Sequence, residues 1–397
     1  MYCNMKKYSI LIVGLKCYYG HLIEVITNLK KTNPLVDITL VSSSIPDRVI
    51  KELSGYVNQI VVCEIHQNNI IPRFLASRLN PIFCYLKLLR LHLKSHFDIV
   101  NIHFATPNVK YAMPILKKMS KNIVISPWGS DVMRVEDEKV INELSKIYSQ
   151  ARYVTNGKDS QIGQCVVEKF KVDPEKMVKL GWGGEFFDFI QENSKKVTTK
   201  EAKDRFGLSD RYVITCGYNT QRAQRHEDII DAIYSVKDQL PRNLTLLLPC
   251  TYVFFKGKST GKEQYVVSLK EKCKALGLDV VIVEEHLDLA DLLKLRMATD
   301  IFVHIQSSDA GSRSVMEYVA CNKKLVHGAW VRYRYLNEYK PSCYFPVDQI
   351  EDLGACIVKA YHSEVGELPQ EVKEVIKKRG WNYKISLWNE FFESLVP

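Results

Sequence analysis

The sequence has few of the features that mark membrane-spanning, secreted or metal-binding chains. It contains no run of about 18 uncharged apolar residues, and its start leads directly into the strand-like segment Tyr8 to Leu15. We therefore expect neither a signal peptide nor a membrane span. Its 11 cysteines are an odd number, with no Cys-x-x-Cys pair and no zinc-like Cys/His spacing. This usage predicts free thiols in a reducing, cytoplasmic setting.

Three fingerprint motifs of nucleotide-handling enzymes are also absent. No Asp-x-Asp pair occurs, so the usual carboxylates for a divalent ion on a diphosphate are missing and we predict no metal site. No Gly-x-x-x-x-Gly-Lys-Ser/Thr loop is present, and no Gly-x-Gly-x-x-Gly follows the first predicted strand. ATPase and dehydrogenase functions therefore lack their phosphate-binding loops.

What is present is the composition of an ordinary globular protein, with 46% hydrophobic and 25% charged residues. A length of 397 residues exceeds what one hydrophobic core supports, so two domains are expected. The formal charge of +10 suggests an anionic partner such as a phosphorylated metabolite, a lipid headgroup or nucleic acid. No nucleic-acid-binding module is recognisable, so we expect no nucleic-acid partner.

Short β-branched runs alternate twice with longer amphipathic stretches, which predicts two α/β domains with parallel sheets. The predicted strands lie near Ser9 to Leu15, Asp37 to Val41, Gln59 to Cys63, Ile99 to His103, Ile123 to Ser126, Tyr153 to Thr155, Val213 to Cys216, Leu244 to Leu248, Val280 to Val283, Ile301 to His304 and Lys324 to Val326. The polar stretch 191–200 reads as a linker. The prediction is thus an N-terminal domain at 1–190, a C-terminal domain at 201–380 and an amphipathic helix at 381–397 that packs on a domain surface.

The most informative segment follows the predicted strand Ile301 to His304. There a small-residue loop opens a helix, whose free N–H groups and positive dipole end suit a diphosphate. Gly311 lets the backbone approach closely, and Ser312 can cap the helix. Asp309 on the loop and Glu317 about two turns along the helix could grip sugar hydroxyls. Alternatively, Glu317 faces solvent and Asp309 only starts a turn.

This segment resembles the family 4 glycosyltransferases and their GT-B relatives, which carry two Glu residues separated by seven others at such a junction. Asp309 stands in place of the first Glu. The resemblance implies a GT-B fold, in which two doubly wound, Rossmann-like α/β domains face a cleft. It also implies that Glu317 holds the ribose hydroxyls of a nucleotide. Asp309 and the loop, through Arg313, would meet the transferred sugar and the phosphates.

A second polar group follows the predicted strand Val213 to Cys216. Family 4 enzymes usually carry Gly-Arg and Lys-Gly pairs here, and neither pair is intact. Arg222 and Arg225 could supply the two charges that clamp a diphosphate. Asn219 with Arg225-His226 is weakly similar to N-acetylfucosamine transferases that act on lipid-linked precursors. A solvated basic loop is the alternative.

The first domain offers His103, Asp131 and Gly20. His103 ends a strand, and Asp131 closes the loop Trp128-Gly-Ser-Asp after the next one; both resemble family positions that project toward donor sugar and acceptor. His103 could bond a sugar hydroxyl or carry a proton, or be a core histidine. Asp131 could instead cap a short helix. Gly20 stands where these enzymes have a Gly-rich turn near the donor phosphate, and could equally be an ordinary turn.

The segment Arg73 to Lys94 mixes bulky apolar residues with five Arg and Lys residues. Cationic amphipathic helices of this kind lie on anionic membrane surfaces, which would suit a lipid-linked acceptor. The outer helices of a sheet look much the same, with the lysines on the solvated face.

We therefore expect a metal-independent glycosyltransferase that uses a nucleotide diphosphate sugar as donor substrate, without a cofactor. Its acceptor would be a saccharide or a lipid-linked saccharide, in bacterial surface polysaccharide synthesis. Its place would be the cytoplasm or the inner face of the cell membrane. The alternatives are a nucleotide-sugar 2-epimerase of the same fold and a non-catalytic, two-lobed sugar-binding protein. The resemblance leaves retaining and inverting transfer both open.

Overall fold

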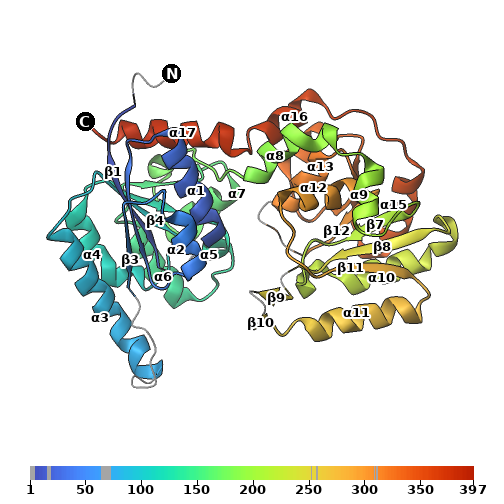
Figure 1. The fold of residues 1–397 in the computed structure, drawn as a ribbon, viewed down its shortest axis with the longest axis horizontal. Coiled ribbons are helices and arrows are strands. Elements are labelled where there is room, and N and C mark those ends of the chain that lie inside the picture. The colour runs from blue at the N-terminus through green and yellow to red at the C-terminus, as the bar shows by residue number, and fades with distance from the viewer. Residues whose placement is uncertain are drawn as a thin grey trace. The chain divides into compact units, whose positions relative to one another are not determined.

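The computed structural model describes residues 5–15, 19–63, 73–251, 253–255, 258–307, 309 and 312–397. The chain forms two compact units, coloured mainly blue to green and green to red in Figure 1. Unit 1 is Met1–Gly183 with Trp381–Pro397, and unit 2 is Gly184–Gly380. In its described part, each unit contains one six-stranded parallel sheet.

Unit 1 has the strand order β3-β2-β1-β4-β5-β6. Its strands are β1 (Ser9–Gly14), β2 (Asp37–Ser42), β3 (Gln59–Val62), β4 (Ile99–His103), β5 (Ile123–Ser126) and β6 (Tyr153–Val154). Its helices are α1 (Tyr19–Thr32), α2 (Asp47–Leu53), α3 (Arg73–His92), α4 (Val109–Met119), α5 (Ser130–Met133), α6 (Glu138–Tyr148), α7 (Gln161–Phe170) and α17 (Trp381–Ser394). The central strands are buried on both faces, as their largely apolar sequences predict.

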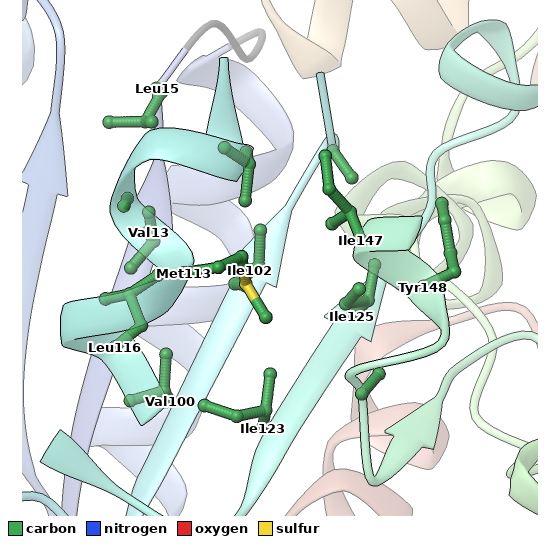
Figure 2. Close-up of a cluster of buried hydrophobic side chains, with 14 of the residues drawn as sticks. Val13, Leu15, Val100, Ile102, Met113, Leu116, Ile123, Ile125, Ile147 and Tyr148 are labelled. Carbon is green, nitrogen blue, oxygen red and sulfur yellow. The ribbon is translucent and has the colours of Figure 1, made fainter. Parts of the chain in front are cut away.

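Two hydrophobic cores cover the two faces of this sheet. On one face, side chains of β1, β4 and β5 such as Val13, Ile102 and Ile125 meet Met113 of α4 and Ile147 of α6 (Figure 2). On the other face, β1 and β2 pack against α1, α2 and α17. The sheet is therefore a rigid layer whose strand ends hold the connecting loops in place.

Unit 2 repeats the topology with the order β11-β8-β7-β12-β13-β14. Its strands are β7 (Tyr212–Cys216), β8 (Leu244–Pro249), β11 (Asp279–Val283), β12 (Ile301–His304), β13 (Lys324–Gly328) and β14 (Tyr344–Val347), beside the hairpin of β9 (Phe254–Phe255) and β10 (Lys258–Ser259). Its helices are α8 (Glu185–Asn193), α9 (Thr199–Arg205), α10 (His226–Ser235), α11 (Glu263–Ala275), α12 (Leu289–Ala298), α13 (Arg313–Ala320), α14 (Arg334–Tyr339), α15 (Leu353–His362) and α16 (Gln370–Lys377). Every predicted strand is present, with ends shifted by a residue or two. The edge strand β14 was not predicted, because Pro346 cannot donate to a sheet.

The boundary between the units differs from the predicted linker at residues 191–200. The change of unit falls between Gly183 and Gly184. Residues 191–200 lie within unit 2, where they finish α8, make one 3-10 turn and begin α9. Helix α8 belongs to this unit because Phe187 packs in the same core as Phe302 of β12. The polar composition of 191–200 is that of an exposed connection between two helices.

The predicted C-terminal amphipathic helix is α17, and it completes unit 1. Trp381, Ile385, Trp388 and Phe392 are buried in the core that covers β1 and α1. The indole Nε1 of Trp381 donates a hydrogen bond of 2.6 Å to Oε2 of Glu24 on α1. The aromatic side of this helix therefore faces the core.

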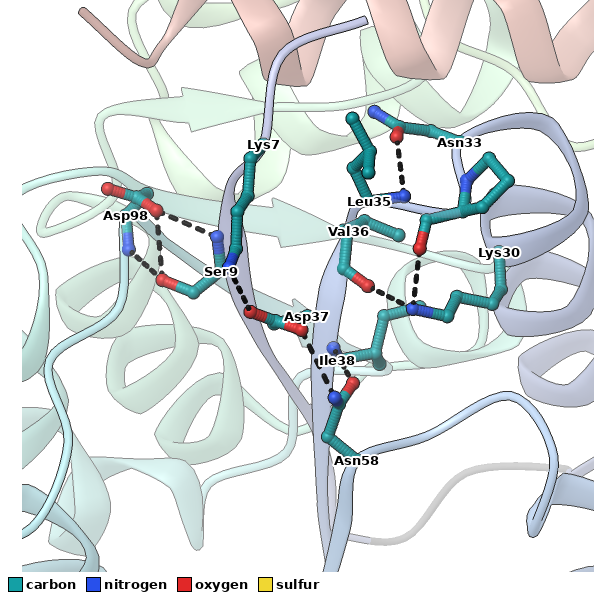
Figure 3. A network of polar contacts seen from close by, with 11 residues as sticks. Lys7, Ser9, Lys30, Asn33, Leu35, Val36, Asp37, Ile38, Asn58 and Asp98 are labelled. Atoms are coloured by element: carbon teal, nitrogen blue, oxygen red, sulfur yellow. Dashed lines mark hydrogen bonds and ion pairs between the residues drawn. The ribbon is translucent and has the colours of Figure 1, made fainter.

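At the amino ends of the central strands, polar side chains satisfy one another. Oδ2 of Asp98, just before β4, accepts hydrogen bonds from the backbone N–H of Ser9 at 2.7 Å and from its hydroxyl at 2.9 Å (Figure 3). Unit 2 repeats the device, because Oδ2 of Asp300, before β12, accepts from the N–H of Val213 at 2.7 Å and from Nζ of Lys203 at 2.8 Å. These carboxylates fix the central strand pair of each sheet.

The carboxyl ends of the same strand pairs are where ligands are expected. In both sheets the chain order reverses between the two central strands, β1 and β4 in unit 1, and β7 and β12 in unit 2. Doubly wound folds bind ligands outside the carboxyl ends of the strands at this point. The loops after these four strands therefore define the candidate sites.

Candidate functional site

The loop between β12 and α13 carries Asp309, which was predicted to meet the transferred sugar. Its Oδ2 lies 3.3 Å from Nε2 of His304 at the end of β12, yet neither atom has a hydrogen-bond partner among the described residues. Burial and then the Asp309 carboxylate raise the pKa of the Tyr333 hydroxyl. Asp309 thus belongs to a polar group with unsatisfied atoms. Gly311, the predicted point of close backbone approach, lies outside the described residues.

Ser312 immediately precedes α13, but its side chain does not cap the helix as predicted. Its backbone N–H donates to the Tyr333 hydroxyl oxygen at 3.1 Å, and the side chain reaches no N–H group of the helix. Arg313 begins α13, and its guanidinium lies near the backbone of Gly184. No acidic side chain lies in the first turn of α13. This end of the helix therefore keeps the partial positive charge that favours a phosphate.

Glu317 is buried on α13, at 6% exposure, so the alternative of a solvent-facing side chain is wrong. Arg296 of α12 donates to Oε2 of Glu317 from Nε at 3.1 Å and from Nη2 at 2.8 Å. Burial alone would lower the pKa of Arg296, but the neighbouring Tyr318 and Glu317 raise it above its ordinary value. The two side chains form a buried, charged pair that the sequence did not predict.

His304 and His327 form a stacked pair that sequence reasoning also missed. They are register partners on the neighbouring strands β12 and β13, with ring centroids 5.2 Å apart and an interplanar angle of 11°. Tyr218, after β7, also stacks on His304 at 5.8 Å. No ring nitrogen of either histidine has a hydrogen-bond partner in the described part of the chain. Burial, followed by the effect of His304, lowers the pKa of His327 to about 3.

A usable signal for this pair was present in the sequence. A histidine follows each of two short apolar runs, Ile301 to Val303 and Leu325 to Val326. The same pattern drew attention to His103 in the first half. His304 and His327 form one group only because β12 and β13 are neighbours in the sheet. The sequence alone does not show that these strands are neighbours.

The three residues predicted in the loop after β7 are all engaged within that loop and α10. Oδ1 of Asn219 accepts from the backbone N–H of Gln221 at 2.8 Å, which shapes the turn. Arg222 lies 3.4 Å from Glu227 and over the ring of Tyr265. Arg225 has a positive φ of 59° and lies 2.6 Å from Asp228. Both arginines follow β7 as predicted, and each already has a carboxylate partner.

Two glutamines join the β7 and β12 loops, and neither was predicted. Nε2 of Gln224 donates to Oε1 of Gln306 at 2.6 Å, and the Tyr218 hydroxyl donates to the same oxygen at 3.2 Å. Oε1 of Gln224 accepts from the backbone N–H of Tyr218. These bonds hold the two loops in register at the point where a ligand is expected.

In unit 1, His103 ends β4 and is completely buried. Neither ring nitrogen has a hydrogen-bond partner among the described residues, and burial lowers the pKa of His103 to about 3. Its ring makes edge contacts with Trp128 at 6.2 Å and Trp182 at 5.5 Å, and these indoles contact each other at 5.3 Å. Aromatic faces beside unsatisfied nitrogens suit a sugar, which presents both C–H faces and hydroxyls.

Asp131 lies within the short helix α5, whose N-cap position is Gly129, so it is not the helix cap given as the alternative. Its Oδ1 accepts from the backbone N–H groups of Trp128 at 2.8 Å and Gly129 at 3.0 Å, so it shapes the turn. Its Oδ2 is buried without a hydrogen-bond partner in the described residues. Burial raises the pKa of Asp131 to about 6 against the lowering effect of its backbone bonds. The second oxygen is therefore suited to take up a proton near neutral pH.

Gly20 lies in α1 rather than in the predicted turn. A Cβ added there would meet no atom within 4 Å, so neither close approach nor backbone conformation requires a glycine. The preceding loop residues 16–18 lie outside the described residues. The next residue, His21, contacts Trp128 edge-on at 5.2 Å. The start of α1 thus borders the aromatic group of unit 1.

Two further properties concern metals and membranes. Across the described ranges, no group of three or more His, Cys, Asp and Glu side chains is arranged to hold a metal ion. No described helix has the length and apolar character that crossing a bilayer requires.

Comparison with known families gives one match in unit 1. Residues 10–156 match the family described as Glycosyl transferase 4-like. No curated protein sequence matches the chain.

Solved structures share the fold over nearly the whole chain. A glycosyltransferase from Rickettsia africae is 16% identical with a TM-score of 0.69, covering 98% of this chain and 99% of its own. HepE of Anabaena, solved with UDP and glucose, is 14% identical with a TM-score of 0.67 over 98% and 100% of the two chains. The E. coli trehalose-6-phosphate structure bound with UDP-2-fluoro glucose is 13% identical, with a TM-score of 0.64 and coverage of 98% and 100%. The chain therefore has the predicted GT-B fold of two Rossmann-like α/β domains.

Proposed function

We propose that this protein is a glycosyltransferase that moves a hexosyl or related sugar from a nucleotide diphosphate sugar to an acceptor. The proposal rests on the location of the buried polar atoms that lack hydrogen bonds among the described residues. At the amino ends of the central strands, Asp98 and Asp300 each accept two hydrogen bonds from neighbouring groups. At the carboxyl ends, His103, His304 and Asp309 have buried atoms without partners among the described residues. Such atoms are costly, and they lie where this fold binds ligands.

The donor belongs against unit 2 in this proposal. The start of α13, with Arg222 and Arg225, would meet the diphosphate, Glu317 the ribose and Asp309 the sugar. Each arginine already pairs with a carboxylate of α10, so a bound diphosphate would replace one anionic partner by another. The UDP and glucose bound by the similar HepE structure support a nucleotide sugar as donor.

The acceptor belongs against unit 1. The indoles of Trp128 and Trp182 would pack on a sugar ring, and the attacking hydroxyl would lose its proton there. His103, with its pKa lowered to about 3, is a weak base, whereas Asp131, with its pKa raised to about 6, is better matched to neutral pH. Asp131 is therefore the preferred proton acceptor of the two.

The leaving diphosphate gains negative charge as the bond to the sugar breaks. Positive groups fixed in advance stabilise such charge without reorganising, and here they would be the two arginines and the start of α13. We propose that no metal ion is needed, on the ground that the sequence lacks an Asp-x-Asp pair. Water must be kept from the site, because it would otherwise capture the activated sugar.

We further propose that the acceptor is lipid-linked, that the enzyme takes part in surface polysaccharide synthesis, and that it lies on the inner face of the cell membrane. The exposed surface of α3 supports this part of the proposal. Its large apolar residues Leu79, Ile82 and Leu86, and Leu93 directly after it, are exposed at helical spacing, while Leu88 and Leu91 pack in the core. In Figure 1 the first half of α3 extends past the neighbouring helix α4. An exposed apolar stripe with nearby basic residues suits an anionic lipid surface.

The proposal is tested by incubating the protein with UDP-, GDP-, ADP- and TDP-sugars and measuring nucleoside diphosphate release. We expect release from one class of donor, faster with a saccharide acceptor, transfer of the sugar to that acceptor, and no loss of activity with EDTA. A protein that neither binds nor cleaves any donor would contradict the proposal. An epimerised nucleotide sugar as product would establish the 2-epimerase instead, and sugar binding without turnover would establish the binding protein.

A further inference from the structure

Arg296 stands out as a buried charge that the proposed reaction has not yet used. It lies on α12 with 4% of its surface exposed. Two of its nitrogens, Nε and Nη2, donate to the same oxygen, Oε2 of Glu317. A carboxylate oxygen has two lone pairs. Oε2 is therefore occupied by the guanidinium, which directs a ligand hydroxyl toward Oε1.

The orientation of the guanidinium is fixed from a second side. Nη1 of Arg296 donates to the hydroxyl of Tyr318 at 3.0 Å, and the guanidinium lies over the Tyr318 ring at 4.4 Å. That ring is stacked on Phe302 of β12 at 3.9 Å. Both aromatic residues are completely buried. The pair of Arg296 and Glu317 is thus held against the central sheet rather than by flexible surface groups.

The stability of the fold does not by itself explain why Arg296 and Glu317 form a buried ion pair. Replacing a buried ion pair by apolar residues of similar volume is often neutral or stabilising. An ionised carboxylate, however, accepts stronger hydrogen bonds from hydroxyls than a neutral group does. Glu317 lies on the helix that begins at the candidate diphosphate site, so a fixed charge there is useful for holding a polar ligand.

The geometry points to Arg296 as a positioning residue that keeps the Glu317 carboxylate turned so that Oε1 accepts hydrogen bonds from the ribose hydroxyls of the donor. This inference rests on the proposed function and deepens it. A site built around a fixed carboxylate should select ribonucleoside diphosphates over their 2′-deoxy forms, because the deoxy form leaves an acceptor without a donor.

The test is calorimetric binding of UDP, GDP and ADP and of their 2′-deoxy counterparts, which needs no turnover. The wild-type protein should prefer the ribose form of its nucleotide by roughly tenfold, as the loss of one charge-assisted hydrogen bond implies. Arg296→Lys keeps the charge but loses the fork, and should reduce the preference. Arg296→Met with Glu317→Gln leaves no unpaired buried charge, and should abolish the preference by weakening binding of the ribose form more than binding of the 2′-deoxy form.

The matched control is Lys203→Met with Asp300→Asn, which breaks another ion pair of unit 2, of 2.8 Å, at the amino end of the sheet. It should lower stability and leave the ribose preference unchanged. Three results would overturn the role of Arg296. The wild type could bind the ribose and 2′-deoxy nucleotides equally, both Arg296 variants could keep the wild-type preference, or a variant could lose affinity equally for the two nucleotides. In each of these cases the donor site itself survives. Failure of the wild type to bind any nucleoside diphosphate would instead remove the proposed function.

Discussion

Nε2 of His304 lies 3.3 Å from Oδ2 of Asp309, and the same imidazole is stacked between Tyr218 and the strand neighbour His327. His304 ends a buried strand, so its ring cannot move far without disturbing β12. The sugar-facing carboxylate of the proposed site therefore lies beside a histidine whose own position is fixed. Because both atoms lack hydrogen bonds within the described residues, a bound donor has room to draw them into a tighter arrangement.

Replacing His304 with Phe should lower the turnover number roughly tenfold, about the effect of losing one charge-assisted contact. Phe keeps an aromatic ring for the stack but removes the nitrogen beside Asp309. Steady-state kinetics with the donor that the nucleotide-sugar panel selects would measure the change. His327→Phe is the control, because it alters the same stack without touching Asp309. Equal effects of both variants would mean that only the packing of the rings matters.

Acid should destabilise the fold through its buried histidines. The folded-state pKa values of His327 and His226 are lowered to about 3 and about 4, mainly by burial. Since the unfolded chain binds protons near pH 6.5, their stabilising contribution is complete above that pH and is lost as the pH falls toward those values. At pH 5 each of the two histidines should lower the free energy of unfolding by about 2 kcal/mol relative to neutral pH.

Urea unfolding at pH 7 and pH 5 measures this loss. His327→Phe should show a smaller difference between the two pH values than the wild type, because one titrating group has been removed. An identical difference in both proteins would show that His327 is accessible to protons in the folded state.

Asp131 should act in the opposite direction. Its folded-state pKa is raised to about 6, chiefly by burial, so the folded state holds a proton that the unfolded chain releases between about pH 4 and pH 6. Ionisation of Asp131 therefore costs stability above pH 6. Asp131→Asn, which can keep both backbone hydrogen bonds, should be about 2 to 3 kcal/mol more stable than the wild type at pH 8, and no more stable near pH 4.

Tryptophan fluorescence during urea unfolding reports on this change, because Trp128, Trp182, Trp381 and Trp388 all belong to unit 1. A gain in stability together with a loss of turnover would support Asp131 as the proton acceptor. If Asp131→Asn were less stable than the wild type at every pH, the prediction that ionised, buried Asp131 costs stability would be wrong.

The exposed stripe of α3 should bind anionic lipid. Ile82→Glu with Leu86→Glu places two negative charges on it, and should abolish sedimentation with vesicles that contain phosphatidylglycerol. The wild type should sediment with these vesicles and less with neutral ones. Leu35→Glu, at a residue of unit 1 that is 50% exposed away from α3, is the control and should behave as the wild type. Equal binding by the double variant would assign the stripe another partner.

Sequence patterns were sufficient where the determinant is local. Strands such as β4 and β12 are short runs made up mainly of apolar residues. A strand followed by a loop and a helix marks its own carboxyl end, which is how His103, Asp131 and Asp309 were found. The linker at 191–200 was wrong, because a polar surface connection between two helices has the composition of an interdomain segment. Local composition does not reveal which unit a helix packs in.

The partners that determine a side chain's role come from elsewhere in the chain. Arg296 and Glu317 are 21 residues apart and lie on different helices, so no spacing rule connects them. His304 and His327 meet only because β12 and β13 are neighbours. The sequence identified a carboxylate at the site, but only the tertiary structure shows that it is buried and paired.

The return of the chain to unit 1 at Trp381 has a consequence for synthesis on the ribosome. Unit 2 is continuous in sequence. Unit 1 needs α17 to complete the core on one face of its sheet, where α17 packs with β1 and α1. Unit 1, although begun first, leaves exposed the part of that apolar face that α17 covers until α17 has been made. Unit 2 can complete its core earlier, so the usual N-to-C order of domain folding is reversed at the final step. During that interval the unfinished face of unit 1 is a natural substrate for chaperones that hold apolar surfaces.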